Sequence, residues 1–323
     1  MRYLRKFLAY VVAKYYCHEV ELTGQIDMYL ECNSWRVFVS NIVGQLCYLT
    51  GLSKCYIAKR VVRFEVSNVC NLQCKMCPQP VKMTRQKMLM DINLFKQVID
   101  ANPYIENVEL FNWGEPLLHP HIIEFVKYCS IKKIKSHIVT NGVRMTPMMA
   151  KELIDAGLTR ISFSLDDVGD NYTNIRGYPY GLVIDNIEKF IGVVENFNAN
   201  MILEIYVTES IYNQGKVKIA VERLKKLIVD AISVYPCVTN EPMNKRDMRC
   251  PELYRKPIIL SNGDIVSCCA DYDGVLKFGS VMEEPNIKKL YNNDIIQNIR
   301  KMMKKQETMP KFCSYCNYAK WGI

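Results

Sequence analysis

Three cysteines, Cys70, Cys74 and Cys77, lie close together in the run Val-Cys-Asn-Leu-Gln-Cys-Lys-Met-Cys. Thiolates at this spacing can each bind one iron of a cubane iron–sulfur cluster, which leaves the fourth iron open to another ligand and supplies single electrons. Soft sulfur ligands suit iron–sulfur clusters and zinc alike. A structural zinc site needs four ligands, however, and this triplet supplies three. The spacing therefore favours a cluster with an open iron over zinc or three buried core thiols.

A strand-like run over residues 61–66 precedes the triplet, and the spacing in this context resembles the radical S-adenosylmethionine (SAM) superfamily. The resemblance implies that the open iron binds SAM through its amino and carboxylate groups. Reduction then cleaves SAM, and the 5′-deoxyadenosyl radical abstracts hydrogen from a substrate. Family members usually carry an aromatic residue before the third cysteine, where it flanks adenine. Here that residue is Met76, whose soft sulfur can contact an aromatic ring.

A second motif, Trp113-Gly114-Glu115-Pro116, follows the next strand-like run. Glycine lets a ligand approach the backbone closely, and the Glu115 carboxylate offers an acceptor for an ammonium group. The motif resembles the family's GGEP segment, which holds the SAM amino group, with Trp113 in place of the first glycine. The alternative interpretation is a turn before a helix with Glu115 in solvent.

Further polar residues stand where other strands are expected to end. By resemblance, Ser164 or Asp166 contacts the SAM ribose or carboxylate, and Asn141 of Thr-Asn-Gly occupies a similar place on the preceding strand. Arg176 suits a clamp on the SAM carboxylate or on substrate, because a guanidinium pairs well with a carboxylate. A surface arginine in a loop that starts a helix is an equal alternative for Arg176.

From residue 61 to about residue 236 the chain alternates strand-like and helix-like segments. Six β/α units in series imply a parallel sheet with right-handed crossovers. We expect an α/β fold, a partial (β/α)6 TIM barrel, with its chemistry at the carboxyl ends of the strands. The expected strands are 63–67, 107–111, 136–140, 160–165, 202–207 and 231–235, and the expected helices are 91–101, 121–130, 147–156, 181–195 and 216–229.

The C-terminal part carries a second set of cysteines. Asn262-Gly263 between apolar runs predicts a hairpin of residues 258–260 and 264–267. The spacing Cys250-x12-Gly263-x4-Cys268 resembles the opening of the SPASM domain, and Cys313-x2-Cys316 follows it. These four cysteines imply one auxiliary 4Fe–4S cluster, as in the shortened twitch form of the domain; zinc is the alternative. Cys268 is favoured over Cys269 as the ligand, because adjacent strand residues face opposite ways.

The cysteine content of the chain bears on the compartment in which the protein acts. The chain has 323 residues, 49% of them hydrophobic, and 14 cysteines without the short length or cleavage site of a disulfide-rich secreted domain. We therefore expect a reducing cytoplasm, and we interpret the cysteines outside the two sets as buried small hydrophobes. These are Cys17, Cys32, Cys47, Cys55, Cys129 and Cys237.

The net charge of +9 lies mainly near the two ends of the chain, a pattern that does not indicate nucleic-acid binding. Residues 3–16 read as a helix with apolar and basic faces that packs on the barrel; contact with a membrane surface is the alternative. The basic series near the C-terminus predicts a solvated helix face, which an acidic redox partner such as flavodoxin or ferredoxin could use. The series is Lys288, Lys289, Arg300, Lys301, Lys304 and Lys305.

Together these patterns predict an N-terminal helical extension (1–60), a radical SAM partial barrel (61–240) and a twitch/SPASM-like auxiliary cluster domain (241–323). The predicted cofactors are SAM and two 4Fe–4S clusters. The predicted activity is radical SAM oxidoreduction, in which a sugar-like or other small polar substrate is dehydrogenated. A peptide-modifying maturase and a non-catalytic iron–sulfur or zinc scaffold are the alternatives.

Overall fold

The computed structural model describes residues 34–55, 58–237 and 250–305 together with Cys313. The predicted helix over residues 3–16 and the cysteines Cys17, Cys32 and Cys316 lie outside the described residues. The domain boundaries placed at residues 60 and 240 stay predictions.

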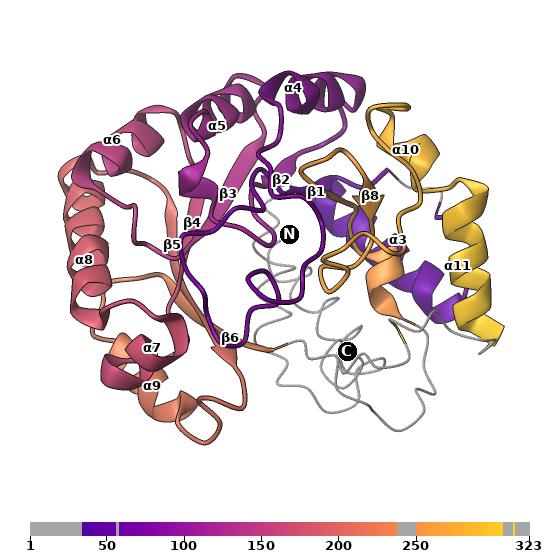
Figure 1. The fold of residues 1–323 in the computed structure, drawn as a ribbon. Coiled ribbons are helices and arrows are strands. Elements are labelled where there is room, and N and C mark those ends of the chain that lie inside the picture. Colours follow the sequence, from indigo (N-terminus) through magenta and orange to yellow (C-terminus); the bar gives the residue numbers. More distant parts are fainter. Residues whose placement is uncertain (1–33, 56–57, 238–249, 306–312, 314–323) are drawn as a thin grey trace.

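A single eight-stranded sheet organises the described chain, in the order β6-β5-β4-β3-β2-β1-β7-β8. The first six strands pair in parallel, and all six correspond to strands predicted from the sequence. Figure 1 shows them as an arc that does not close into a full barrel. The expected α/β partial barrel is therefore confirmed. The six strands are β1 (Val61–Phe64), β2 (Asn107–Glu109), β3 (Lys135–Thr140), β4 (Arg160–Ser164), β5 (Ile202–Glu209) and β6 (Ala231–Pro236).

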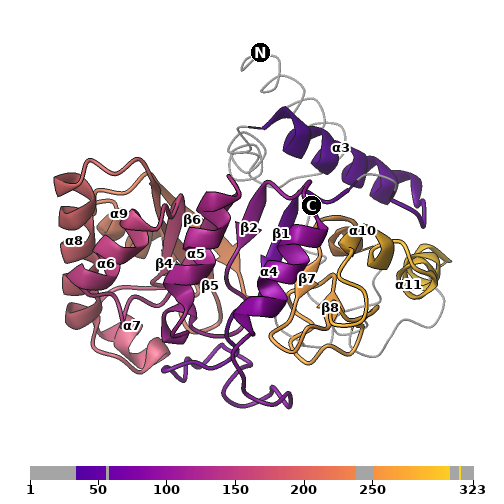
Figure 2. The same ribbon diagram turned by 90° about the horizontal axis from the view of Figure 1, so that it is seen from above.

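Helices lie outside the arc and connect successive strands (Figures 1 and 2). Each of the five predicted helices is present, although the last ends at Leu224 instead of residue 229. The chain turns back there, because Asp230 already accepts a hydrogen bond from the Leu203 amide of β5 at 2.7 Å. These helices are α4 (Ile92–Ala101), α5 (Ile122–Ile131), α6 (Pro147–Asp155), α8 (Tyr180–Asn196) and α9 (Val217–Leu224).

Two helices within the described chain were not individually predicted. Helix α3 (Trp35–Thr50) begins at the N-cap Ser34 and ends at Gly51 in the left-handed conformation. Helix α7 (Gly169–Arg176) follows β4 and ends at Gly177, also left-handed. Its residues are mostly polar, so it lacks the apolar periodicity that marks an amphipathic helix. Two 3-10 turns, η1 (Pro116–Leu118) and η2 (Pro251–Tyr254), complete this part of the chain.

The predicted hairpin is confirmed as β7 (Ile258–Ile259) and β8 (Ile265–Val266), which pair antiparallel. The Gly263 amide donates to the Leu260 carbonyl at 2.8 Å, and Gly263 has φ +85°, a conformation that glycine accepts without strain. Strand β7 pairs in parallel with β1. The hairpin that precedes the C-terminal cysteines therefore continues the barrel sheet, an arrangement that the sequence pattern did not indicate.

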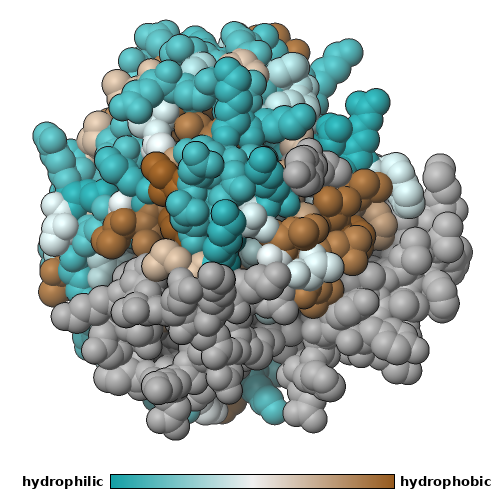
Figure 3. Space-filling model, turned by 90° about the vertical axis from the view of Figure 1, so that its right-hand side faces the viewer, coloured by the Kyte–Doolittle hydropathy of each residue, from teal (hydrophilic) through white to brown (hydrophobic). Residues whose placement is uncertain are grey.

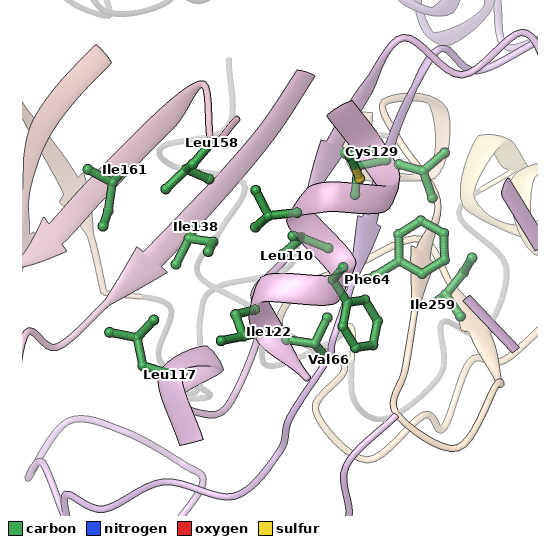
Figure 4. Packing of buried hydrophobic residues seen from close by; sticks show 14 of the residues in the cluster. Phe64, Val66, Leu110, Leu117, Ile122, Cys129, Ile138, Leu158, Ile161 and Ile259 are labelled. Carbon is green, nitrogen blue, oxygen red and sulfur yellow. The ribbon is translucent and has the colours of Figure 1, made fainter. Parts of the chain in front are cut away.

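The hydrophobic core lies between the sheet and its helices (Figure 4). Val62 and Phe64 of β1 are fully buried, whereas Arg63 between them is partly exposed. This alternation follows from the strand geometry, since successive side chains point to opposite faces. Phe64 meets Phe95 of α4 edge to face, with ring centroids 4.8 Å apart. The helix side of the sheet is therefore apolar, and Arg63 points to its inner side.

The C-terminal helices α10 (Ile287–Leu290) and α11 (Asp294–Lys305) correct one prediction. Lys288, Lys289 and Lys301 are exposed as expected, but Arg300 is only 1% exposed. Its side chain donates to the backbone carbonyls of Leu253 at 3.0 Å and Ser53 at 2.8 Å. Arg300 is therefore a structural cross-link and not part of a solvated face.

Figure 3 shows the side of the molecule that carries α11, where hydrophilic groups alternate with separate hydrophobic patches. No helix among the described residues is long and apolar enough to span a membrane.

Candidate functional site

The first cysteine triplet occupies an irregular loop directly after β1. Cys70, Cys74 and Cys77 are half-buried, and the Cys77 amide donates to the Cys74 carbonyl at 3.0 Å. Burial raises the pKa of all three thiols, that of Cys77 to about 12, and each pair adds mutual repulsion when ionised. Protonated thiols must release their protons to bind iron. The attraction between the thiolates and the positively charged iron offsets the cost of this ionisation.

Arg176 places a positive charge beside this loop. Its charge acts to lower the pKa of each cysteine thiol against the effect of burial. Arg176 is 7% exposed and lies at the end of α7. The alternative of a surface arginine in a loop is therefore wrong.

Arg176 is held by Asp166, which follows β4. The Arg176 Nε and Nη2 atoms lie 2.8 and 2.7 Å from the Asp166 Oδ2 atom. The Thr208 amide donates to the other carboxylate oxygen at 2.9 Å, and Asp166 itself has φ +54°. A non-glycine residue in this conformation is uncommon and marks a site that its surroundings constrain.

The donors of this loop suit an iron–sulfur cluster. The thiols of Cys70, Cys74 and Cys77 lie on one short loop, and each iron of a cluster takes one thiolate. Beside them, Tyr172 of α7 is fully buried, interacts electrostatically with Cys74, and has a hydroxyl without a hydrogen-bond partner among the described residues. The described residues contain no three Cys, His, Asp or Glu side chains grouped closely enough to hold one metal ion.

The Trp-Gly-Glu-Pro segment packs directly against the start of the cysteine loop. A Cβ atom on Gly114 would lie 2.1 Å from the Ser67 carbonyl oxygen and 2.8 Å from the Asn68 Cα atom. Both neighbours are backbone atoms, so only glycine permits this approach. The next amide, that of Glu115, donates to the Val69 carbonyl at 2.8 Å. Glycine at this position therefore brings two loops of the site together.

Glu115 is 1% exposed, and burial raises the pKa of its carboxyl. One carboxylate oxygen accepts from the Leu117 amide at 3.0 Å and the Thr140 hydroxyl at 2.7 Å. The other accepts from the Asn141 amide at 2.8 Å. A carboxylate has about four acceptor positions, so this second oxygen retains one for a further donor. The alternative of a solvated glutamate is wrong.

Asn141 connects Glu115 to the cysteine loop. Its side-chain amide donates to Asn71 at 2.9 Å and lies 3.9 Å from the Cys70 sulfur. Ser164, at the end of β4, is half-buried, and Pro116 begins η1. The predicted SAM residues therefore follow β1, β2, β3 and β4 at the same edge of the sheet, as the rule for parallel sheets requires.

Met76, in the cysteine loop, lies beside Cys237, which follows β6. Met76 is half-buried, and the Cys237 thiol donates to its carbonyl at 4.0 Å. Cys237 is half-exposed, so its assignment as a buried core thiol is wrong, whereas Cys47, Cys55 and Cys129 are buried as predicted. The contact of Met76 with adenine stays a prediction.

Trp113 contacts the C-terminal cysteine segment. Its indole N–H donates to the Cys269 carbonyl, and its ring meets Tyr272 edge to face at 6.1 Å. The residue that replaces the first glycine of the motif thus joins the triplet side of the site to the C-terminal cysteine segment.

The C-terminal cysteines come from distant parts of the chain. Cys250 and Cys313 are each 7% exposed. Within the adjacent pair, a hydrogen bond between the two thiols raises the pKa of Cys268 and lowers that of Cys269 to about 7. Cys268 interacts electrostatically with Cys250, and Cys269 with Arg63 and Lys256. This difference favours Cys268 as the partner of Cys250.

The inner face of the sheet carries a row of charged and polar residues that was not predicted from the sequence. The signal was available, because Arg63 stands between two apolar residues in a strand that is otherwise apolar. We call this row the inner belt. It consists of Arg63, Glu109, His137, Arg160, Ser162, Glu204 and Lys256.

An open depression of about 690 Å³ lies at the amino ends of β1 and β2, opposite the cysteines. Trp35, Arg60, Tyr104 and Glu106 contribute to its lining. No residue of the predicted site borders it, so we locate the chemistry at the cysteines and not at this depression.

Comparison with known proteins decides the family. Residues 64–211 match the sequence profile described as the radical SAM superfamily, and residues 250–317 match the SPASM iron–sulfur cluster-binding domain. The chain belongs to the radical SAM superfamily. Its C-terminal part is a SPASM domain, so SAM, its 4Fe–4S cluster and auxiliary iron–sulfur binding follow from the family.

Individual relatives agree with this assignment. The tungsten-containing aldehyde ferredoxin oxidoreductase cofactor-modifying protein of Pyrococcus furiosus is 27% identical over 46% of this chain and 44% of its own. The chain thus spans less than half of that relative's length. The structure of BtrN in complex with AdoMet and 2-DOIA has a TM-score of 0.54 at 19% identity, covering 81% of this chain and 94% of BtrN. Streptococcus suis SuiB bound to precursor peptide SuiA has a TM-score of 0.60 at 14% identity, with 87% and 71% covered.

Proposed function

We propose that this radical SAM enzyme oxidises a small polar substrate, of which a sugar-like alcohol is the simplest case. The observation that carries the SAM half of the proposal is the arrangement around Glu115. Its buried carboxylate has one acceptor position left and shares Asn141 with the loop that carries Cys70. When bound, the cluster and SAM supply a 5′-deoxyadenosyl radical that abstracts hydrogen from the substrate.

The chain's own residues then have distinct roles. Cys70, Cys74 and Cys77 would each hold one iron of the cluster, and Glu115 would accept an N–H of the SAM ammonium group. Asn141 orients Glu115 through its backbone amide. Ser164 or Asp166 would contact the SAM ribose or carboxylate. Because the Arg176 guanidinium contacts Asp166 through both Nε and Nη2, Arg176 positions Asp166 and supplies positive charge beside the thiolates.

The auxiliary site supports oxidation as the outcome. Four thiolates, from Cys250, Cys268, Cys313 and Cys316, would occupy all four irons of one cluster and leave none for substrate. After hydrogen abstraction from a secondary alcohol, the substrate radical loses one proton and one electron and becomes a ketone. A cluster held by these four cysteines would accept that electron. With the cluster held by the triplet, the protein would then contain two clusters.

A polar substrate is favoured by the inner belt. Its charged residues point to the inside of the barrel, where an α/β barrel usually carries bulky apolar side chains. The alternative function, that of a peptide-modifying maturase, would require a peptide substrate. SuiB was crystallised with such a peptide. The electron for SAM cleavage would come from flavodoxin or ferredoxin, for which the exposed Lys288, Lys289 and Lys301 offer a basic surface.

Release of 5′-deoxyadenosine tests the enzymatic half. The anaerobically reconstituted protein should release it from SAM with dithionite, and the Cys70→Ala/Cys74→Ala/Cys77→Ala variant should not. The Cys313→Ala/Cys316→Ala variant should still cleave saturating SAM but form no oxidised product. If neither the wild type nor the triple variant releases 5′-deoxyadenosine, the protein is a non-catalytic scaffold. Wild-type product formation by the double variant removes the electron-acceptor role.

A further inference from the structure

The inner belt runs sideways across five strands. The strand register pairs Arg63 with Glu109, and Glu109 with His137 on the next strand. His137 pairs in turn with Arg160, and Ser162 of the same strand pairs with Glu204. All lie on the inner face, because the alternate residues of these strands pack against the helices. The belt is thus a continuous polar surface inside the partial barrel.

Hydrogen bonds divide the belt into two groups. In the first, the Glu109 carboxylate accepts from Arg63 Nε at 2.7 Å and from Lys256 Nζ at 2.5 Å. In the second, Glu204 accepts from Arg160 Nε at 2.6 Å and from the Ser162 hydroxyl at 2.8 Å.

His137 joins the two groups. Its Nε2 atom lies 2.8 Å from the Ser162 hydroxyl oxygen, and its ring meets Phe111 beside Arg63. Burial holds the pKa of His137 well below its ordinary value, so this side chain is neutral.

The charges of the first group do not balance. Burial opposes ionisation of Glu109, but Arg63 and Lys256 outweigh it and hold the pKa of this carboxyl below its ordinary value. Within hydrogen-bonding distance, one carboxylate therefore contacts two basic side chains. The other nearby acid, Glu252, is already paired with Arg255 at 2.7 Å. In the second group one carboxylate faces one arginine, so the surplus positive charge of the belt lies at Arg63 and Lys256.

These two cations also have unused donors. Among the described residues, the terminal Nη atoms of Arg63 form no hydrogen bond, and Lys256 uses one of its three N–H groups. The side chains are 15% and 23% exposed, so they are not sealed in the core. The Arg63 guanidinium lies 4.5 Å over the Phe111 ring, which fixes its plane.

The position of this pair relative to the two cysteine sites matters. Arg63 belongs to β1, whose carboxyl end leads into the Cys70 loop. Both Arg63 and Lys256 interact electrostatically with Cys269, which neighbours the proposed ligand Cys268. The surplus charge thus lies on the inner face between the SAM site and the auxiliary site.

We propose that Arg63 and Lys256 bind an anionic group, a carboxylate or a phosphate, on a small substrate. Two cations that share one carboxylate in a partly buried place are costly unless a second anion joins them. A guanidinium held in a fixed plane pairs with carboxylate or phosphate oxygens through two parallel hydrogen bonds. The inference rests on the proposed oxidation of a small polar substrate and narrows that substrate to an acidic one.

Binding of inorganic phosphate and of acetate to the SAM-loaded holoenzyme tests the inference. Calorimetry at constant ionic strength should detect one of these anions. A charge-assisted hydrogen bond contributes about 1.5–3 kcal/mol, so Arg63→Gln should weaken binding about 10- to 100-fold. Lys256→Gln should act in the same direction. The stronger of the two probes identifies whether the group is a phosphate or a carboxylate.

Arg60→Gln is the matched control. Arg60 also pairs with a glutamate, Glu106, at 2.7 Å and precedes the same strand, but it borders the depression at the opposite end of the sheet. This variant should bind the anion as the wild type does. Melting temperatures of all variants exclude misfolding as the cause of a loss.

Three results would overturn the inference. The first is that the folded wild type binds neither anion. The second is that the wild type and Arg63→Gln bind the anion equally well. The third is that Arg60→Gln loses as much anion affinity as Arg63→Gln. A redox titration of the auxiliary cluster adds a further arm. If Arg63→Gln changes only its midpoint potential, the charge serves the cluster and not a substrate. Arg63-dependent anion binding without 5′-deoxyadenosine release would retain the anion site and remove the proposed function instead.

Discussion

The triplet Cys70, Cys74 and Cys77 and the C-terminal cysteines around Cys268 are proposed to hold the same kind of cluster, but the chain builds the two sites differently. The triplet comes from one short loop, fixed by the close approach of Gly114 and the amide of Glu115. The C-terminal set consists of Cys250, Cys268, Cys313 and Cys316, and its successive members are 18, 45 and 3 residues apart in the chain.

The difference lies in what holds each site. The triplet loop is positioned by backbone contacts within the barrel. The C-terminal set depends on side chains that cross between elements, such as Trp113, which donates to the Cys269 carbonyl, and Arg300, which donates to the Leu253 carbonyl near Cys250. We therefore expect the first site to form without the second, whereas the second depends on the barrel.

Iron content gives the largest expected effect in this comparison. Replacing Cys70, Cys74 and Cys77 by alanine should remove about half of the iron from the reconstituted protein. Replacing Cys250 and Cys268 by alanine should remove the other half and leave the triplet cluster. Metal analysis of both variants measures this directly. Loss of all iron from either variant, or zinc in place of the second half, would contradict the assignment of two independent clusters.

Gly114→Ala should have the next largest effect, because the added methyl group would meet Ser67 and Asn68 backbone atoms that cannot move aside. Strain of this kind costs about 1–3 kcal/mol of unfolding free energy. Gly192→Ala is the control: Gly192 lies in α8 and has no atom within 4 Å of an added Cβ. The control should be neutral or stabilising by up to about 1 kcal/mol. Thermal melts of both variants that coincide with the wild type would show that the close approach is unimportant.

The sequence predicted the first site more completely than the second for the same physical reason. Motif spacing reports residues that are near in the chain, so Cys70 and Glu115 could be assigned at once, and the strand order followed from regular β/α alternation. The pairing of β7 with β1 is a contact between residues about 195 apart, for example Arg63 with Ile258. Nothing in the local pattern of either segment reports it.

Arg300 and Cys237 show that residue type alone does not predict whether a side chain is buried. A charged residue in a basic series is usually exposed, but Arg300 finds backbone carbonyl acceptors at Ser53 and Tyr291. A cysteine outside a metal motif is usually buried, but Cys237 follows β6, an edge strand of the sheet, and contacts the Met76 carbonyl. In both cases the deciding partner is distant in sequence, so only the folded chain reveals it.

Glu115→Gln gives the most specific of these effects, because it is expected to change the binding of one ligand. The substitution keeps the shape of the side chain but removes the charge that pairs with the SAM ammonium group. A lost charge-assisted bond of about 1.5–3 kcal/mol weakens SAM affinity by about one to two decades. Equilibrium binding of SAM to the reconstituted protein measures the change. Glu106→Gln is the matched control, because Glu106 precedes β2 where Glu115 follows it, and its partner is Arg60 at the far end.

The pH dependence of SAM binding separates charge from shape at Glu115. Burial raises the pKa of Glu115, so its ionised form is lost as the pH falls through that raised value, earlier than for an exposed glutamate. Wild-type affinity for SAM should therefore weaken on acidification, while Glu115→Gln, which has no proton to gain there, should lose that part of the dependence. Parallel pH profiles for the two proteins, or unchanged affinity in the variant with its cluster intact, would show that Glu115 serves the packing of the loops and not the cofactor.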